Sequence, residues 1–485
     1  MSAASSMSLS LGARRTVLAY VGVTILVVAL MMLLGLLLRL SQAQILILPP
    51  DLFYQVMTAH GIGMVGISGL GGAAIMWYFL NRYVKLSTGI FVANLLLFLA
   101  GVVCILGAIF LGGFAAAWTF LFPLPAKPMG VWSSGAAAWY LVGVLLVGVG
   151  FLLFYLDAGR AILVKYGSLG RALGWPQLFG RDSGEAPPPT VVASTVVSVM
   201  NILSTVVGAT ILTICLVNLY VPGFAVDALL AKNLIFFFGH VFINAAIYMT
   251  VIAVYEILPR YANRPWTSSR VFLAAWTATL IMVLIVYPHH LLMDFAMPVW
   301  ALVMGQIISY TSGLPVLVVT MIGTLAIVYR SGLRWDLVSG LLFLSVFGWA
   351  AGILPAIIDA TIVVNHVMHN TLWVPGHFHF YLILGLVGML FAFGYHLAKS
   401  EGGLQGNAAD QVSFWVFAVA GLGVAGTFLL AGKNSIPRRY AVHLPEWLPY
   451  DRIASLFAAL AVAAVLVFTV RFLMRLRPMA GAAQP

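Results

Sequence analysis

The chain has 485 residues, of which 62% are hydrophobic and only 8% are charged. Soluble domains carry about a quarter charged residues, so this composition cannot give several soluble domains a polar surface. Disordered chains are polar and poor in aromatic residues, and two cysteines cannot staple a disulfide scaffold, so both classes are excluded. The net charge of +11 comes from basic residues scattered between apolar runs. We therefore expect no nucleic-acid partner, but a polytopic protein in contact with membrane lipid.

Apolar runs long enough to cross a bilayer, roughly 20 residues each, recur twelve times along the chain. They predict an all-α membrane protein in which residues 1–485 form a single transmembrane domain. The expected spans are 16–40, 53–80, 90–115, 136–160, 191–220, 230–258, 270–290, 299–328, 337–362, 372–397, 413–431 and 453–475. The first is too long for a removable signal peptide and is expected to stay as an anchor. Residues 159–190, rich in Gly, Pro and charges, predict a flexible cytoplasmic loop.

Basic residues predict the orientation of these spans. With both termini in the cytoplasm, seventeen of the 24 Lys and Arg residues fall on the cytoplasmic side. Four of the other seven lie in the outer connection between spans eleven and twelve, namely Lys433, Arg438, Arg439 and Arg452. Such a cluster indicates an anionic partner; alternatively, the loop is balanced by its own acids, Glu446 and Asp451.

Histidine inside a membrane is costly and usually functional. Six of the ten histidines are expected near the outer ends of four spans: His60, His240, His289, His290, His377 and His379. A single one could simply be hydrogen-bonded to a neighbouring helix. Six at about the same depth indicate metal binding.

The spacing of these histidines separates them into sites. His289 and His290 end a span beside Pro288, and with His240 they make a three-imidazole set that suits copper or zinc. Non-haem iron is less expected, since its sites usually include a carboxylate and no Asp or Glu lies in the outer half of these two spans, so copper is favoured. His377 and His379 are two positions apart and leave a helix about 200° apart, so they serve two different centres.

Two haems would explain the remaining histidines. A low-spin haem needs two axial ligands, for which His60 and His379 are the candidates, and His377 would then be the single ligand of a second haem. Arg438 and Arg439 can bind haem propionates through charge-assisted hydrogen bonds. The chain has no CxxCH sequence, so neither haem is expected to be attached covalently.

The run HNTLWVPGHFH at 369–379 resembles the span-ten motif of the B-type oxygen reductases, within subunit I of the haem–copper oxidoreductases. Phe238–His240, Tyr287–His290 and Pro437–Tyr440 resemble the family's copper-ligand, double-histidine and propionate motifs, and the likeness covers nearly the whole chain. The resemblance implies a low-spin haem on His60 and His379 and a high-spin haem on His377, and both haems are expected to be b-type. It also implies copper on His240, His289 and His290. His369 and Asp359 are expected near the haem propionates. His366 and Asn365 are weaker candidates there, since a polar helix end explains them equally well.

One position departs from the pattern of the oxygen reductases. A- and B-type members carry a tyrosine four residues after the first copper histidine, linked to a copper ligand, which supplies an electron and a proton; here the residue is Asn244. Tyr248, one further turn along, does not obviously replace it, and Tyr287 does not match the tyrosine of C-type members. An amide cannot deliver a hydrogen atom, although it can hydrogen-bond NO.

Proton supply has a weaker signature. In B-type members an inner channel uses polar residues on spans six and eight, which Tyr255 matches and Val316 does not. Glu256 lies at the inner end of this expected channel. Four hydroxyls could hold a chain of water between Glu256 and the metals, namely those of Thr250, Thr311, Ser312 and Thr320. We favour the alternative, in which these hydroxyls form hydrogen bonds within their own helices.

These observations predict a haem–copper nitric oxide reductase on a B-type scaffold, which reduces NO to N2O. The first alternative is an oxygen reductase that uses Tyr248 or Tyr287 as its hydrogen donor. The second is a transporter with a histidine relay. The third is a haem-binding, quinol-linked subunit without a dinuclear centre, but the adjacent His289 and His290 argue against it. Cys104 and Cys215 lie within spans, so electrons are expected from a cupredoxin-like or cytochrome c-type partner on the outer face. The resemblance implies the plasma membrane of a bacterium or archaeon. Trp373 is expected to pack against a haem macrocycle, and His396 and His443 are expected to be structural.

Overall fold

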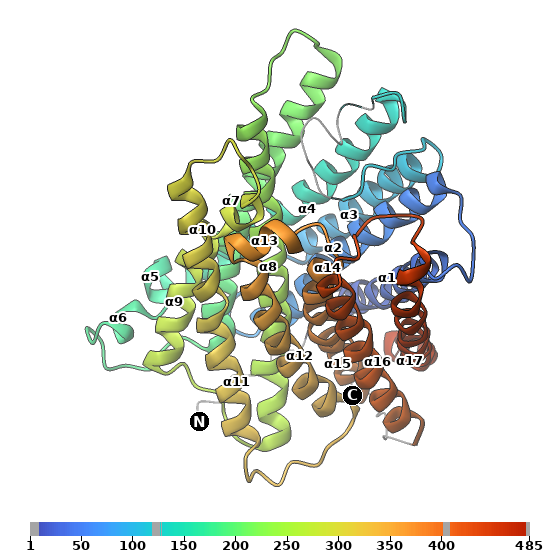
Figure 1. Ribbon diagram of the computed structural model, residues 1–485. Coiled ribbons are helices and arrows are strands. Elements are labelled where there is room, and N and C mark those ends of the chain that lie inside the picture. The colour runs from blue at the N-terminus through green and yellow to red at the C-terminus, as the bar shows by residue number, and fades with distance from the viewer. Residues whose placement is uncertain (1–8, 119–126, 128, 401–407, 482–485) are drawn as a thin grey trace.

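The computed structural model describes residues 9–118, 127, 129–400 and 408–481. Within this part of the chain the secondary structure is helical, apart from an isolated β-bridge between Thr371 and Pro437. Twelve stretches of the described chain are long and apolar enough to cross a membrane, which confirms the predicted all-α architecture. Figure 1 shows them as a bundle whose consecutive helices lie side by side.

The first six spans are each one continuous helix: α1 (Leu11–Gln42), α2 (Pro50–Leu80), α3 (Thr88–Phe110), α4 (Ser134–Tyr166), α7 (Pro189–Tyr220) and α8 (Ala228–Ala262). The others are α9 (Arg270–Ile285) with the 3₁₀ turn η1 (Tyr287–Leu291), α10 (Val299–Ser312) with α11 (Leu314–Val328), α12 (Leu337–Asp359), α14 (Trp373–His379) with the π-helix η2 (Phe380–Val387) and α15 (Gly388–Ser400), α16 (Ala408–Lys433), and α17 (Leu448–Gly481). Short connecting helices are α5 (Leu169–Ala172), α6 (Trp175–Leu178), α13 (Ile362–Met368) and η3 (Pro445–Trp447).

Four spans begin before their predicted apolar runs, each with a polar capping residue. Ser10, Ser87, Ser133 and Asp227 each accept a hydrogen bond from a backbone N–H in the first turn of their helix. The third span was predicted too long, to residue 115: its helix ends at Phe110, shortly before Gly113 with φ +71°.

The loop predicted for residues 159–190 is shorter than expected and partly helical. The fourth helix continues to Tyr166 and ends at Gly167, whose φ of 77° terminates it, and α5 and α6 follow before α7 begins at Pro189. The sequence pattern missed this because Arg160 and Lys165 lie beyond the apolar run although the helix continues through them.

Three spans change their helical geometry along their length. Pro288 lies in the 3₁₀ turn η1 that follows α9, Gly313 separates α10 from α11, and the eight residues after His379 form a π-helix. A π-helix this close to a histidine pair is notable, because π-turns are rare and occur mostly at functional sites.

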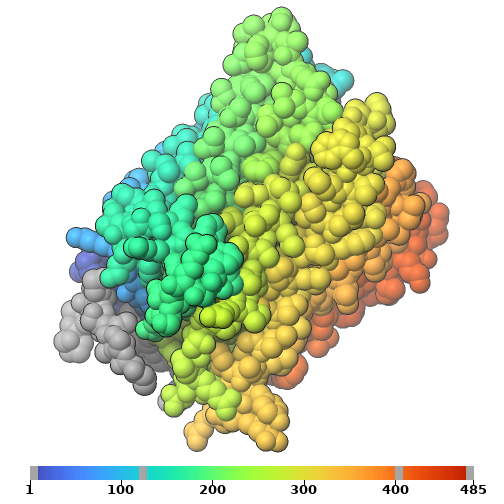
Figure 2. All heavy atoms as spheres, turned by 90° about the vertical axis from the view of Figure 1, so that its left-hand side faces the viewer, coloured from blue at the N-terminus to red at the C-terminus, as the bar shows by residue number. Residues whose placement is uncertain are grey.

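Two spans form the centre of the bundle. In α8 and in the α14–α15 span, 94% of the apolar window is buried, against 28% in the α10–α11 span at the periphery. Both central spans carry predicted site histidines, so these side chains are shielded from lipid by the surrounding helices. The hairpin that joins α7 to α8 projects beyond the neighbouring helices in both views (Figures 1 and 2).

The start of α14 lies directly against the end of α16, which Gly432 makes possible. A Cβ atom at Gly432 would lie 2.0 Å from the backbone nitrogen of Trp373. The backbone of the α16–α17 connection holds the same segment through hydrogen bonds from Leu372 N to Ile436 O and from Arg438 N to Asn370 O, each 2.9 Å. The segment before His377 and His379 is therefore fixed by close backbone contact.

We predict that Gly432→Ala lowers the free energy of unfolding by about 1–3 kcal/mol, because the methyl group meets backbone that cannot rotate away. Gly426→Ala in the same helix is the matched control, since a Cβ atom there meets nothing within 4 Å. Thermal unfolding of the purified variants would measure the difference. Equal stability of the two variants would contradict this account of the α14–α16 contact.

Candidate metal centre

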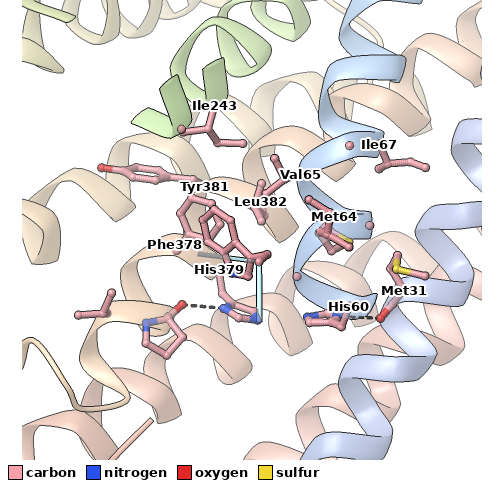
Figure 3. A pocket seen from close by; sticks show the side chains of 18 of the residues that line it. Met31, His60, Met64, Val65, Ile67, Ile243, Phe378, His379, Tyr381 and Leu382 are labelled. Carbon is pink, nitrogen blue, oxygen red and sulfur yellow. Dashed lines mark hydrogen bonds between the residues drawn. The ribbon is translucent and has the colours of Figure 1, made fainter. Parts of the chain in front are cut away.

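A large cavity, with a volume of about 650 Å³, opens inside the bundle. Seven of the ten histidines line it, which are His60, His240, His289, His290, His369, His377 and His379. They come from α2, α8, η1, α14 and the segment before α14, at the end of the bundle where α2 and α8 begin. We call this the histidine end. Figure 3 shows the part of the cavity between His60 and His379.

His240, His289 and His290 form a compact group. Each offers one ring nitrogen, and these three atoms lie within 4.8 Å of one another; in the described part of the chain this is the one group of at least three metal-ligating side chains that meets that limit. His240 Nδ1 is 2.9 Å from His290 Nε2. The 3₁₀ turn brings this about, because it directs two consecutive side chains toward α8. Three converging imidazoles without a carboxylate suit copper or zinc.

Two contacts at the histidine end attach this turn to α8. The Tyr287 hydroxyl donates to Asn233 Oδ1 at 3.0 Å, and Lys232 forms an ion pair with Asp294 just beyond the turn. Tyr287 therefore directs its hydroxyl toward Asn233. This contact gives Tyr287 a positioning role for the turn.

Asn244 lies one helical turn after His240, and its amide contacts the same imidazole. Its Nδ2 is 3.0 Å from His240 Nε2 and donates to the His240 carbonyl oxygen at 2.9 Å. His240 thus presents Nδ1 to the other two histidines and Nε2 to Asn244. An amide in this place orients the ring, as outer partners of metal-ligating histidines commonly do.

His60 and His379 each have one ring nitrogen engaged with the backbone. The Nδ1–H of His60 donates to Met31 O at 2.7 Å, and that of His379 donates to Pro375 O at 2.6 Å. These bonds leave the Nε2 lone pairs free, and Figure 3 shows the two rings facing each other across the pocket. Gly35 leaves room for His60, since a Cβ atom there would lie 2.8 Å from its ring. Two neutral imidazoles across an apolar slot are the donor set that a low-spin haem requires.

His377 leaves α14 on another side from His379, as the spacing predicted. Its ring lines the cavity and lies edge-on to Tyr381, with ring centroids 5.9 Å apart. Its Nδ1 is buried without a hydrogen-bond partner in the described structure. A single imidazole beside the three-histidine group fits the axial ligand of a second haem.

Two arginines bring positive charge to the rim of the cavity. Arg438 and Arg439 both line it, and the β-bridge between Thr371 and Pro437 brings their segment against the start of α14. Burial, followed by the neighbouring Arg439, lowers the pKa of Arg438 to about 9, while Asp359 opposes the shift. Burial also lowers the pKa of Arg439. Two partly buried cations side by side favour an anionic group at this rim.

Asp359 and His369 lie at the same rim. Burial and the two arginines lower the pKa of His369 to about 4, so this imidazole is neutral at physiological pH. Asn365 donates to both the carbonyl and the carboxylate of Asp359. Asn365 also lines the cavity, whereas His366 is exposed on α13.

The structure brings two further residues to the cavity that the sequence analysis did not single out. Tyr381 follows His377 by four positions, a spacing that could have indicated a shared helix face. Arg39 on α1 forms a buried ion pair with Asp451 at 3.4 Å, and its guanidinium lies 4.8 Å from the centre of the Phe428 ring. Asp451 also accepts from His443 at 2.7 Å, which gives His443 a structural role. Nothing in the local sequence connects Arg39 with a residue so distant along the chain.

Tyr248 is buried on α8 and lines the cavity. It packs edge-on against Trp276 and Trp349, with centroid distances of 5.5 and 6.3 Å. It thus lies deeper in the bundle than Asn244, and Asn244 has the direct contact with His240.

We predict that replacing His240, His289 or His290 singly by Ala reduces bound copper from about one ion per chain to a small fraction, because two imidazoles hold the ion far more weakly than three. Elemental analysis of the purified variants would measure this. His366→Ala is the matched control and should keep its copper. Full copper content in all three single variants would refute the assignment.

Comparisons with known proteins agree on the family. Residues 15–465 match the family model described as cytochrome c and quinol oxidase polypeptide I. A heme-copper oxidase subunit I+III of Aeropyrum pernix is 26% identical over 255 residues, covering 51% of this chain and 30% of that protein. A cytochrome c oxidase subunit 1 of Cereibacter sphaeroides is 25% identical over 256 residues, covering 51% of this chain and 44% of that protein. The matched segment thus spans less than half the length of these two relatives.

Two further matches cover more of the chain. The cytochrome c oxidase polypeptide 1 of Halobacterium salinarum is 24% identical over 440 residues, covering 87% of this chain and 70% of that protein. The cryo-EM structure of a heme-copper terminal oxidase dimer superposes with a TM-score of 0.80 at 19% identity, covering 98% of this chain and 85% of that one, and shows the same fold. From the match over residues 15–465, the chain belongs to the cytochrome c and quinol oxidase polypeptide I family.

Proposed function

We propose that this chain is the catalytic subunit of a membrane-bound haem–copper nitric oxide reductase. Two NO molecules, two electrons and two protons would give one N2O and one water. The observation that carries the proposal is the contact between Asn244 and His240 Nε2, at 3.0 Å. The side chain that contacts His240 here is a carboxamide. In the A- and B-type oxygen reductases that this sequence resembles, the same position, four residues after the histidine, is a tyrosine.

The geometry of the cavity supports an assignment of residues to each cofactor. His60 and His379 would hold a low-spin haem, His377 a high-spin haem, and the three-histidine group copper. When bound, these groups would supply electrons and a dinuclear site for the reaction of NO. Arg438 and Arg439 would hold the propionates, with Asp359 and His369 at the same rim. We propose that both haems are b-type.

Asn244 is suited to NO reduction because of what its side chain can and cannot do. Its amide can donate or accept a hydrogen bond, but it cannot give up a hydrogen atom as a phenol does. Cleavage of an O–O bond in the oxygen reductases uses that extra electron and proton, whereas reduction of two NO molecules takes two electrons in all. The missing phenol therefore does not impair the proposed reaction.

Oxygen reduction is the second candidate, favoured by the names of the relatives, which are cytochrome c oxidases and heme-copper oxidases. Tyr248 and Tyr381 line the cavity and are the tyrosines that such a reaction would use. Tyr287 is a poorer candidate than the sequence analysis expected, because its hydroxyl is bonded to Asn233. A histidine-relay transporter is not supported, since the family match is to oxidase subunits.

We also propose the partner and the membrane orientation. The histidine end lies on the outer side in the orientation predicted by the basic residues, with both termini on the cytoplasmic side of a bacterial or archaeal plasma membrane. A cupredoxin-like or cytochrome c-type donor would dock at this end, because electron transfer needs a short distance to the cavity.

The purified protein should reduce NO faster than O2 when supplied with a one-electron donor. Asn244→Ala should lower NO turnover by about tenfold or more, since a positioned hydrogen bond near the reacting atoms is lost. Asn244→Tyr should lower NO turnover as well, because the larger ring fills part of the space beside His240. NO-consumption and O2-consumption electrodes would measure both rates.

The haem spectrum of each variant, if equal to that of the wild type, excludes misfolding as the cause. Wild-type turnover of O2 at or above the rate with NO would overturn the proposal in favour of an oxidase.

A further inference from the structure

A row of polar side chains runs along α7, the fifth span. Its members are Thr190, Ser194, Ser198, Asn201 and Thr205, each at most 3% exposed. Their spacings of four, four, three and four residues place them on one face of the helix. The burial of these side chains turns this face into the bundle, where α7 packs against α8 and α4, so the polar groups form a continuous row in an otherwise apolar interior.

Bonding within the helix explains only part of this row. Ser198 donates to Ser194 O at 2.8 Å, and Thr205 donates to Asn201 O at 2.6 Å, as buried hydroxyls in membrane helices often do. Ser194 Oγ, however, is buried without a partner among the described residues, whereas Asn201 is hydrogen-bonded to the side chains of Tyr155 and Ser204. An unsatisfied buried polar group costs about 1–3 kcal/mol, so ordered water is expected beside Ser194.

The first member of the row is connected to a carboxylate. The Thr190 hydroxyl donates to Glu256 Oε1 on α8, and Tyr83 donates to the same oxygen at 2.8 Å. Arg82 and Arg260 lie 3.5 and 4.0 Å from Glu256 Oε2, and the Arg260 side chain is 48% exposed. Glu256 therefore lies just beneath the surface at the end of the bundle opposite the histidine end.

The last member of the row reaches the cavity. Thr205 lines the same cavity as His240 and Asn244. Ser204, beside it, donates to Asn201 Oδ1 at 3.3 Å. From Thr190 to Thr205 the helix rises about 22 Å, with roughly 6 Å between successive members, which is the spacing that one bridging water can fill.

We propose that this row, from Glu256 through α7 to Thr205, is the path by which protons enter the cavity. The inference rests on the proposed function, in which each N2O formed consumes two protons and two electrons from a one-electron donor. Each hydroxyl would accept a proton from one water and release its own to the next, while Asn201 holds water in place. No bond to the protein is made or broken in the net reaction.

A second polar line on α8 and α11 is less continuous. Tyr255 and Thr320 are hydrogen-bonded at 2.7 Å, but the next positions toward the cavity are the buried Val316 and the indole ring of Trp276, which packs between Tyr255 and Tyr248. Tyr255 and Thr320 belong to the channel expected from the sequence, so this second line is the alternative proton path that the experiment must distinguish from the row on α7.

The experiment uses the full-length protein in liposomes with a trapped pH dye and NO as the acceptor. A membrane-impermeant one-electron donor added outside reduces only molecules whose histidine end faces outward, so their Glu256 end faces the lumen. The proposal predicts that the lumen becomes alkaline during turnover, with valinomycin and K⁺ present to balance charge. Alkalinisation of the outer medium alone would overturn it.

The variants are Ser194→Val, Asn201→Leu and Glu256→Gln, which fill the water positions or remove the carboxylate. Each should lower turnover and lumenal alkalinisation by about tenfold or more, and increase the solvent deuterium isotope effect, with an unchanged haem spectrum. Thr195→Val is the matched control: Thr195 is equally buried on α7 but bonds to Val191 O and points about 100° away from Ser194. It should stay within about twofold of the wild type.

Ser194→Ala and Asn201→Ala replace any variant that fails to retain its haems. Wild-type turnover in all variants of the α7 row would refute the proposal. If Thr320→Val then lowered turnover, the proton path would follow the line of Tyr255 and Thr320 instead. Turnover with O2 but not with NO would refute the proposed function instead, and the same variants would then test the row with O2.

Discussion

The burial of seven imidazoles around one cavity of an apolar bundle is the constraint on which the rest of the structure depends. A polar ring removed from water without a partner costs several kcal/mol. The backbone satisfies one nitrogen each of His60 and His379, and Asn244 approaches one nitrogen of His240. One ring nitrogen each of His240, His289 and His290 converges on a common point, where metal coordination would compensate the cost. The central position of α8 and α14 then follows, since ligands must be held away from lipid.

The surrounding contacts serve to position these rings. Gly35 and Gly432 allow helices to approach where a side chain would collide, the η1 turn directs two consecutive histidines to one point, and the Tyr287–Asn233 bond attaches that turn to α8. The row on α7 lies outside this shell. In our proposal this row connects the cavity with the opposite end of the bundle, so that protons taken up at that end would reach the cavity.

The sequence predicted the features that depend on local composition and period. Twelve apolar runs were sufficient to predict twelve spans, and the two-residue spacing of His377 and His379 was sufficient to predict that they serve different sides of a helix. Helix ends were less predictable, because capping serines and Gly113 or Gly167 set them rather than hydropathy. The π-helix after His379 has no signal that a hydropathy pattern can detect.

Features made by distant residues could not be predicted. The ion pair of Arg39 with Asp451 joins the first and last spans, and the bond between Thr190 and Glu256 joins two spans whose polar residues appear unrelated in the sequence. Tyr381 lies four residues after His377, so helical spacing alone is sufficient to predict that the two side chains share a face. Asn244 was identified as unusual, and the structure adds which nitrogen of His240 it contacts.

The central claim is that six histidines around one cavity hold two haems and one copper ion. The metal and haem content of the purified protein tests this claim most directly. A pyridine haemochrome assay combined with elemental analysis should give two b-type haems and one copper per chain, with one haem low-spin and one high-spin in the electron paramagnetic resonance spectrum. A protein without haem, or with a single haem and no copper, would contradict the account.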